Sequence, residues 1–271
     1  MNFNEYRKRK FIDKTCEHHP DCQLFLITLP GWGEVEHCED CAREAVLKQE
    51  DNLNRSSAID SKLVDTYVVF ERDSIVSDKL KAKSLDNYKT DAEIDQKAVN
   101  YAKRMEQFYR QDRKGNAIVT GPSGVGKSHL TYGLAKLMNE QFKAYNNPKS
   151  VLFVSVVSLF NKIEESFNVD NGFSKAKMVE LLTRVDYLFL DDLGKESRKD
   201  GNKAKNEWRH SILYEILDNR TNTIINTNLN SAEIKSLYAD DFGNGALSSR
   251  ILEGVTGNSF VYPKGTEDRR Y

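Results

Sequence analysis

The order of hydrophobic and polar positions divides the chain at about residue 90. Beyond it, short apolar runs alternate with longer segments whose apolar residues recur at helical spacing. The short runs predict strands at 116–121, 151–157, 187–192 and 222–228. The longer segments predict helices at 91–111, 128–142, 159–167, 175–184 and 207–220. This alternation predicts an α/β domain whose parallel sheet is covered by helices on both faces.

The first 70 residues have a different pattern and predict a small separate domain. They contain all four cysteines, the turn sequence LPGWGE and a helical segment, AREAVLKQEDNL. Domains with so little core often need a metal or a disulfide for stability. Residues 71–90 are polar and rich in charge, so they predict a linker between a domain at 1–70 and a domain at 91–271.

The charge balance and the short apolar runs argue against a strongly basic nucleic-acid-binding protein and against a membrane-spanning protein. Forty basic and forty-one acidic residues leave a net charge of -1, so a nucleic-acid contact would need a local patch. The strongest apolar run, 151–160, is far shorter than the ~20 residues of a membrane-spanning helix. No apolar stretch follows the charged start in the manner of a secretory signal. We therefore expect a cytoplasmic protein with no membrane partner, in which clustered thiols favour a metal over disulfides.

Residues 121–128, GPSGVGKS, have the pattern of a phosphate-binding loop between a strand and a helix. Glycines let the backbone wrap around phosphate oxygens, and the helix N-terminus directs free N–H groups at them. Lys127 would neutralise the β and γ phosphates, and the Ser128 hydroxyl would ligate Mg²⁺. The alternative is a glycine-rich turn that caps an ordinary helix. The predicted cofactor-binding residues are Gly121, Pro122, Ser123, Gly124, Val125, Gly126, Lys127, Ser128, His129 and Asp191.

Two later apolar runs end in polar side chains that suit the same site. In YLFLDD, Asp191 would hold Mg²⁺ and Asp192 would orient or deprotonate the attacking water. The alternative interpretation is that both carboxylates cap a helix. In TIINTN, Asn228 is a better candidate than Thr227 for a contact with the γ-phosphate or the attacking water. Alternatively, Asn228 and Asn230 are turn residues.

Together with LSSRILEG, these motifs resemble those of the AAA+ ATPases in the same order. The resemblance covers about residues 84–271 and is closest to helicase loaders of the DnaC and DnaI type, with the transposition helper IstB as a near relative. It rests on SLDNYKTD, GPSGVGKSHL, LFLDDLG, TIINTNL and SSRILEG. It implies an AAA+ P-loop NTPase fold, ATP and Mg²⁺ as cofactors, ATPase activity, and self-assembly through AAA+ interfaces.

Arg250 in SSRILEG matches the arginine finger of this family, which contacts the γ-phosphate held by a neighbouring subunit. An ordinary surface arginine is the alternative. Asp192 stands where AAA+ proteins commonly have glutamate, which implies weak hydrolysis that DNA or a partner stimulates. Only 21 residues follow Arg250, too few for a helical lid, so no lid-borne sensor arginine is expected. The predicted catalytic residues are Asp192, Asn228 and Arg250.

The resemblance also implies contact with single-stranded DNA. Lys162, Lys175 and Lys177 would line such a path, and Phe167 or Phe173 would be available for base stacking. The alternative interpretation is that these lysines lie on the polar faces of amphipathic helices and contact only water. The basic stretch YRKRK near the start is open to the same two interpretations.

The cysteines form two pairs, Cys16 with Cys22 and Cys38 with Cys41. Five and two residues lie inside the pairs, and fifteen lie between them. This spacing predicts a zinc site that is closed by four protein ligands and is therefore structural. The first pair is wider than usual, so nearby histidines are rival ligands. These are His18, His19 and His37. Buried free thiols are the alternative.

Loaders of the DnaI type resemble this chain in having a zinc-stabilised N-terminal domain that binds the replicative helicase, which IstB-type helpers lack. We therefore interpret the chain as an ATP-dependent loader of a DnaB-type replicative helicase hexamer that also binds single-stranded DNA. The alternatives are an IstB-type transposition helper, a phage inhibitor of host helicase loading, and a nucleotide-gated binding module with negligible turnover.

Overall fold

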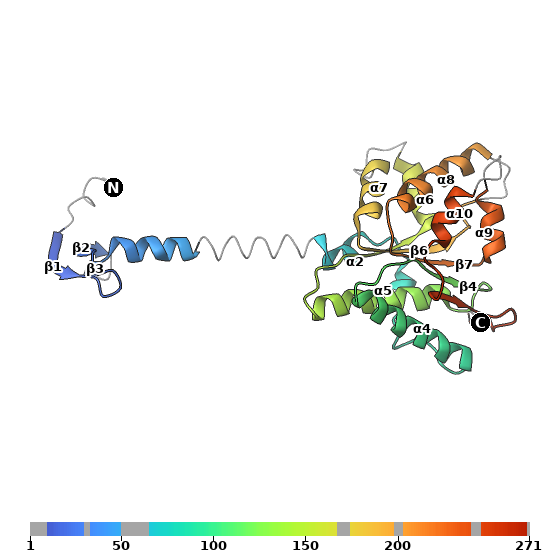
Figure 1. Cartoon of the computed structure of the whole chain (residues 1–271), viewed down its shortest axis with the longest axis horizontal. Helices are drawn as coiled ribbons and strands as arrows, with labels where there is room; N and C mark the ends of the chain where they lie inside the picture. Colours follow the sequence, from blue (N-terminus) through green and yellow to red (C-terminus); the bar gives the residue numbers. More distant parts are fainter. Residues whose placement is uncertain are drawn as a thin grey trace. The chain divides into compact units, whose positions relative to one another are not determined.

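The computed structural model describes residues 10–29, 33–49, 65–166, 174–197, 203–239 and 245–269. The chain forms two compact units, Met1–Lys62 and Leu63–Tyr271, and Figure 1 colours them along the sequence. The basic stretch YRKRK, except for its last residue, lies outside the described residues, as do Phe167 and Phe173.

The first unit is an antiparallel sheet followed by a helix over residues 39–49. Its strands, in spatial order, are β1 (Lys10–Thr15), β2 (Gln23–Leu29) and β3 (Gly33–His37). Among its described residues, the buried apolar ones are Cys16, Phe25 and Cys38. A core of this size cannot stabilise the unit by burial alone.

The second unit is built on a parallel sheet with the strand order β5-β6-β7-β4-β8. The strands are β4 (Ala117–Thr120), β5 (Val151–Ser155), β6 (Tyr187–Leu193), β7 (Thr223–Thr227) and β8 (Ser259–Val261). The four predicted strands are present. The run predicted at 151–157 is too long, because Val156 already begins a helix. The three-residue edge strand β8 was not predicted.

Helices cover both faces of this sheet, which confirms the predicted α/β architecture (Figure 1). One face carries α4 (Glu93–Arg110) and α5 (Lys127–Ala144). The other carries α6 (Val156–Ser166), α7 (Lys175–Arg184), α8 (Lys203–Asp218), α9 (Ser231–Leu237) and α10 (Ala246–Leu252).

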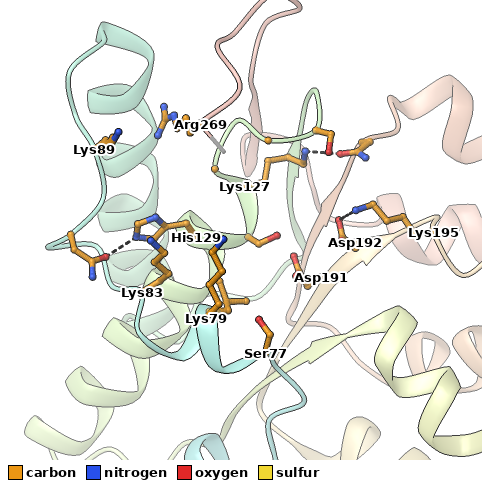
Figure 2. Close-up of a pocket in the computed structure, with 17 residues that line it drawn as sticks. Ser77, Lys79, Lys83, Lys89, Lys127, His129, Asp191, Asp192, Lys195 and Arg269 are labelled. Atoms are coloured by element: carbon orange, nitrogen blue, oxygen red, sulfur yellow. Dashed lines mark hydrogen bonds and ion pairs between the residues drawn. The ribbon is translucent and has the colours of Figure 1, made fainter. Parts of the chain in front are cut away.

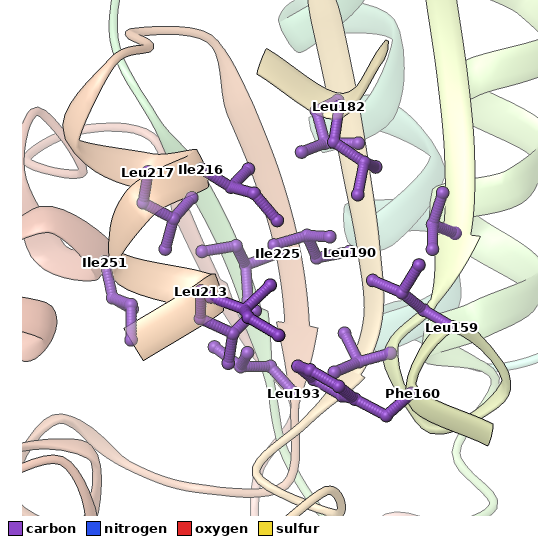
Figure 3. Packing of buried hydrophobic residues seen from close by; sticks show 14 of the residues in the cluster. Leu159, Phe160, Leu182, Leu190, Leu193, Leu213, Ile216, Leu217, Ile225 and Ile251 are labelled. Carbon is purple, nitrogen blue, oxygen red and sulfur yellow. The ribbon is translucent and has the colours of Figure 1, made fainter. Parts of the chain in front are cut away.

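Each face has its own core because successive strand side chains point to opposite sides. In β6, Leu188 and Leu190 pack into the core shared with α6, α7 and α8, which Figure 3 shows from close by. Tyr187 and Phe189, the alternate residues, belong to the core shared with α4 and α5. The sheet is therefore fixed between two helical layers, and the loops at the carboxyl ends of its strands have a rigid base.

Residues 71–90 do not form the predicted linker. Residues 71–73 end the helix α2 (Tyr67–Asp73), whose apolar face is buried, and Ile75 then pairs with Val154 of β5. The Ile75 N–H donates to the Phe153 carbonyl at 2.9 Å. This backbone pairing explains why the segment belongs to the second unit, which begins at Leu63.

The rest of the predicted linker also packs on the second unit. The short helix α3 (Asp78–Lys81) is followed by Tyr88, which is 4% exposed. A pattern search misses such a segment because its apolar residues are few and widely spaced, although Ile75 and Tyr88 are buried.

Candidate functional site

The phosphate-binding loop joins β4 to α5 at the carboxyl end of the sheet. Gly121, Gly124 and Gly126 have φ angles of 143°, 84° and 97°, which side chains other than glycine rarely adopt. The 18-residue helix α5 begins at Lys127, directly after the loop. Its first N–H groups and its partial positive charge therefore face the space that the loop surrounds. This is the geometry of an anion site.

Lys127 points back into the loop. Its Nζ donates to the carbonyls of Gly121 and Pro122 at 2.9 and 2.7 Å, and to Asn228 Oδ1 at 2.6 Å. Burial lowers the pKa of Lys127 to about 8, while the charge of Asp192 acts in the opposite direction. A partly desolvated ammonium interacts more strongly with an anionic ligand than an exposed one.

The other predicted loop residues divide into two groups. Ser123, Ser128 and His129 line a cavity of about 490 Å³, as do two of the glycines. Pro122 contributes its carbonyl to Lys127, and Val125 is completely buried in the core. A volume of this size suits a nucleotide.

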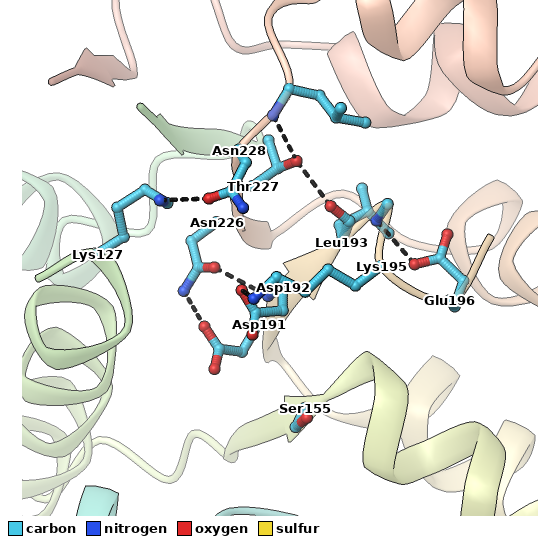
Figure 4. Close-up of polar contacts among 12 residues, drawn as sticks. Lys127, Ser155, Asp191, Asp192, Leu193, Lys195, Glu196, Asn226, Thr227 and Asn228 are labelled. Carbon is cyan, nitrogen blue, oxygen red and sulfur yellow. Dashed lines mark hydrogen bonds and ion pairs between the residues drawn. The ribbon is translucent and has the colours of Figure 1, made fainter. Parts of the chain in front are cut away.

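The predicted carboxylates stand at the end of β6, facing the loop (Figures 2 and 4). Asp191 is 6% exposed and accepts a hydrogen bond from Ser128, so the two predicted Mg²⁺ ligands lie together. Asp192 has a φ of 62° and pairs with Lys195 Nζ at 2.7 Å. Both carboxylates line the cavity.

Asn226 positions these carboxylates and was missed by sequence reasoning. It lies inside β7, is 1% exposed, and donates to Asp191 Oδ1 and, at 2.9 Å, to Thr131 Oγ1. Its Oδ1 accepts the Asp192 N–H at 2.9 Å, which stabilises the left-handed backbone there. Thr227 and Asn228 in TIINTNL are polar as well, so the sequence alone does not show that Asn226 is the residue beside both carboxylates.

Three polar residues at and just beyond the end of β7 have separate roles, and Figure 4 shows two of them, Thr227 and Asn228. Asn228 lines the cavity and contacts Lys127. Thr227 is buried and donates to the Leu193 carbonyl at 2.7 Å. Asn230 caps α9 by accepting the N–H groups of Ala232 and Glu233. The structure therefore places Asn228 at the site and gives the other two structural contacts.

Cationic side chains surround the side of the cavity opposite the carboxylates (Figure 2). Lys79, Lys83, Lys89 and Arg269 line it, together with His129. The His129 Nε2 lies 2.8 Å from the Ser84 carbonyl, and burial lowers the pKa of this imidazole. His129 was predicted from the sequence, whereas Arg269 and the three lysines were missed, the lysines because they lie in the supposed linker.

Arg250 lies outside this cavity, on α10. Its guanidinium is held by Asp218 at 2.7 Å and Glu253 at 3.2 Å, and its side chain is 39% exposed. It therefore does not contact the nucleotide cavity of its own chain.

The lysines predicted to contact DNA are on the surface of α6 and α7. Lys162 and Lys177 are exposed, and Lys175 pairs with Glu215 at 3.7 Å. Their role in DNA binding stays a prediction.

In the first unit, a compact cluster contains three of the four predicted cysteines and one of the rival histidines. Ligand atoms of Cys16, His19, Cys38 and Cys41 all lie within 4.8 Å of one another. His19 Nδ1 is 3.3, 3.7 and 3.9 Å from the sulfurs of Cys41, Cys38 and Cys16. Tetrahedral zinc with bonds of about 2.3 Å to sulfur and 2.0 Å to nitrogen requires separations of about 3.5 Å. The cluster fits such an ion.

A neighbouring carboxylate supports a metal at this cluster. The His19 Nε2 lies 3.0 Å from Glu44 Oε1, a carboxylate contact typical of zinc-bound histidine. The contact with Cys16 raises the pKa of Cys41 to about 12. Cys22 Sγ is 3.4 Å from Cys38 Sγ but is outside the group of four. Among the rivals, His37 instead packs against the Phe25 ring.

This ligand set makes a prediction for zinc binding. The His19→Ala variant should bind zinc about 100-fold more weakly, because it loses one of four ligands. Cys22→Ser should retain one zinc per chain within about threefold of the original affinity. Chelator competition measures both. If Cys22→Ser loses zinc and His19→Ala keeps it, the ligands are the four cysteines, and this prediction is wrong.

The protonation of Asp191 makes a prediction for pH. Burial raises its pKa to about 6, with a further contribution from Asp192. Because Mg²⁺ binds the carboxylate form, its apparent affinity in the presence of ATP should fall about tenfold per pH unit below pH 6. Magnesium titrations with a fluorescent ATP analogue from pH 5 to 7.5 measure this. The Asp191→Asn variant is the control, because its amide does not titrate and any remaining pH dependence comes from ATP. Equal pH profiles in the variant and the unaltered chain would contradict the assignment of Asp191 as a Mg²⁺ ligand.

A phosphate loop that faces two carboxylates and an asparagine on neighbouring strands defines a P-loop ATP-binding protein with the AAA+ fold. Residues 70–269 match the family described as IstB-like ATP binding protein. The chain belongs to this family. The match confirms the predicted family resemblance and supports the predicted ATPase activity.

The chain is also similar to individual helicase loaders. It is 26% identical over 140 residues to the replicative helicase loader DnaC of Buchnera aphidicola subsp. Baizongia pistaciae (strain Bp). These 140 residues are 52% of this chain and 51% of that protein. The match thus spans about half the length of that protein.

Two solved structures share the fold. A crystal structure of DnaI has 22% identity and a TM-score of 0.50, covering 72% of this chain and 94% of that one. A crystal structure of the DnaC helicase loader has 20% identity and a TM-score of 0.51, covering 68% and 98%. Across the described parts of the chain, no helix has the length and apolar character to cross a bilayer.

Proposed function

We propose that the chain is an ATP-dependent loader of a replicative DNA helicase. The observation that carries the proposal is the convergence of Lys127, Asp191, Asp192 and Asn228 on one cavity. The family match and the similarity to a DnaC loader support the same interpretation. The Cys/His cluster of the first unit also suits a loader of the DnaI type.

The residues around the cavity have distinct roles in this proposal. Lys127 turns from the carbonyls of its own loop to the β and γ phosphates, which releases Asn228 to contact the γ-phosphate or the attacking water. Ser128 and Asp191 hold Mg²⁺, which neutralises phosphate charge when bound. Asp192 orients the water and accepts its proton. Its side chain is shorter than the usual glutamate, so turnover is slow without a partner.

Arg250 acts on the ATP of a neighbouring subunit. It is partly exposed and lies outside the cavity of its own chain, as a residue that acts across an interface must. ATP binding then favours assembly through Arg250, and hydrolysis releases the neighbours.

The two remaining partners are assigned to different units. The first unit, stabilised by zinc, binds the helicase hexamer. The second unit contacts single-stranded DNA, with Lys162 and Lys177 as exposed candidates for phosphate contacts.

A pull-down tests this function directly. The full chain, immobilised with ATP and Mg²⁺, should retain the replicative helicase hexamer of the organism that encodes it, and retain less with ADP. The Lys127→Ala chain serves as the control. Equal retention by both chains, or no retention, contradicts the proposal.

An IstB-type transposition helper is the second candidate, because the matching family is described by that name. Such a helper would coat duplex DNA and retain a transposase in the same pull-down. An inhibitor of host helicase loading would bind the helicase but reduce replication when added to a host loader. A nucleotide-gated binding module would bind ATP and partners without phosphate release.

A further inference from the structure

The segment Tyr262–Arg269, called here the 262–269 segment, lies against the outside of the phosphate loop. Its first residue continues from β8, and the Tyr262 N–H donates to the Thr120 carbonyl at 2.9 Å. A Cβ on Gly121 would lie 2.6 Å from Tyr262 Cβ, and a Cβ on Gly124 would overlap the Asp268 carboxylate. The glycines therefore allow approach of this segment as well as of phosphate.

Arg269 is held at the loop by contacts to three elements. Its N–H donates to the Gly124 carbonyl at 3.1 Å. Its guanidinium pairs with Asp95 of α4 and lies 5.0 Å from the centre of the Tyr88 ring. Tyr88 in turn shares a 2.6 Å hydrogen bond with Tyr262. Residues far apart in sequence thus surround the loop on its outer side.

The ion pair is well shielded from water, and Arg269 also reaches the nucleotide cavity. The side chains of Arg269 and Asp95 are 17% and 6% exposed, so solvent screens their attraction little. Arg269 lines the cavity across from Asp191 and Asp192, as Figure 2 shows. An arginine that is not carried by a helical lid therefore faces the site.

We propose that Arg269 is a positioning residue for nucleoside polyphosphate binding: fixed by Asp95 and Tyr88, it holds the phosphate loop in its binding conformation. This inference rests on the proposed ATP site. Because the loop contacts phosphates that ATP and ADP share, both nucleotides should depend on Arg269 equally. The chemical step involves Asp192 and Asn228 on the other side of the cavity, so it should depend on Arg269 little.

The test compares nucleotide affinity and turnover in full-length variants. Arg269→Ala should weaken both ATP and ADP about tenfold and raise KM by the same factor, with kcat changed less than about twofold. Asp95→Asn should give a similar shift, and the double variant should be no worse than the more affected single variant, because both remove one contact.

Arg104→Ala is the matched control. This arginine lies 5.5 Å from the Tyr101 ring and donates to the Gly257 carbonyl at 2.9 Å, but it does not line the cavity. Its nucleotide affinity should equal that of the unaltered chain.

The outcomes separate this inference from the proposed function. If Lys127→Ala loses nucleotide while Arg269→Ala and Asp95→Asn bind normally, the ATP site stands and the inference fails. If Lys127→Ala binds normally, the ATP site itself is wrong. Thermal unfolding without nucleotide checks each fold. Should Arg269→Ala not fold, Arg269→Lys, which keeps the charge but not the planar fork, should raise KM about threefold. An unchanged KM in that variant overturns the inference.

Discussion

Lys127→Ala should lower ATP affinity at least about 100-fold, because charge-assisted hydrogen bonds to phosphate are among the strongest in proteins. The ammonium is placed by the loop carbonyls and Asn228, and the nearby Lys195 is already paired with Asp192. A titration with a fluorescent ATP analogue measures the loss. Lys143→Ala, an exposed lysine near the other end of α5, is the control.

Stability distinguishes this effect from unfolding. Burial lowers the pKa of Lys127 to about 8, so its charge is unfavourable in the protein without nucleotide. Alanine should therefore leave the melting temperature unchanged or raise it slightly. A lowered melting temperature together with an ATP affinity within threefold of the original would contradict the assignment of Lys127 as the phosphate-binding lysine.

Arg250→Ala should reduce ATP hydrolysis about 1,000-fold under assembling conditions and leave ATP binding unchanged. The reason is that this guanidinium lies outside its own cavity and would act only on a neighbour's γ-phosphate. Phosphate release and light scattering measure hydrolysis and assembly. Arg110→Ala is a matched control, because that arginine also forms a surface ion pair, with Glu106 at 2.8 Å.

Mixing the two inactive variants tests the direction of action. An Arg250→Ala subunit keeps an intact ATP site, and a Lys127→Ala neighbour still offers Arg250. Hydrolysis should therefore return in the mixture. If the mixture stays inactive while both variants still assemble, Arg250 does not act between subunits.

The central part of the fold and site could be predicted because its signals are local. The apolar runs ending at Thr120, Leu193 and Thr227 form neighbouring parallel strands, and their carboxyl ends bring Lys127, Asp191 and Asn228 together. A glycine-rich loop between a strand and a helix has few other uses. Motif spacing therefore predicted that these residues would meet at one cavity.

The missed features depend on contacts between distant residues. Asn226 lies inside β7 and contacts Asp191 and Thr131, whereas Asn228 lies just beyond the strand and contacts Lys127. His19 lies among the sulfurs of Cys16, Cys38 and Cys41 because the turn after β1 brings its imidazole there. Arg269 reaches the cavity only because β8 adds to the sheet edge beside β4. None of these has a periodic signal in the sequence.

Helicase loading on a circular single strand tests the central claim most directly. The substrate is a DNA circle without free ends, with one annealed oligonucleotide whose release reports a loaded helicase. With the cognate replicative hexamer, release should require the chain and ATP, and the Lys127→Ala chain should not support it. Equal release without the chain, or with the Lys127→Ala chain, would contradict the account of an ATP-dependent helicase loader.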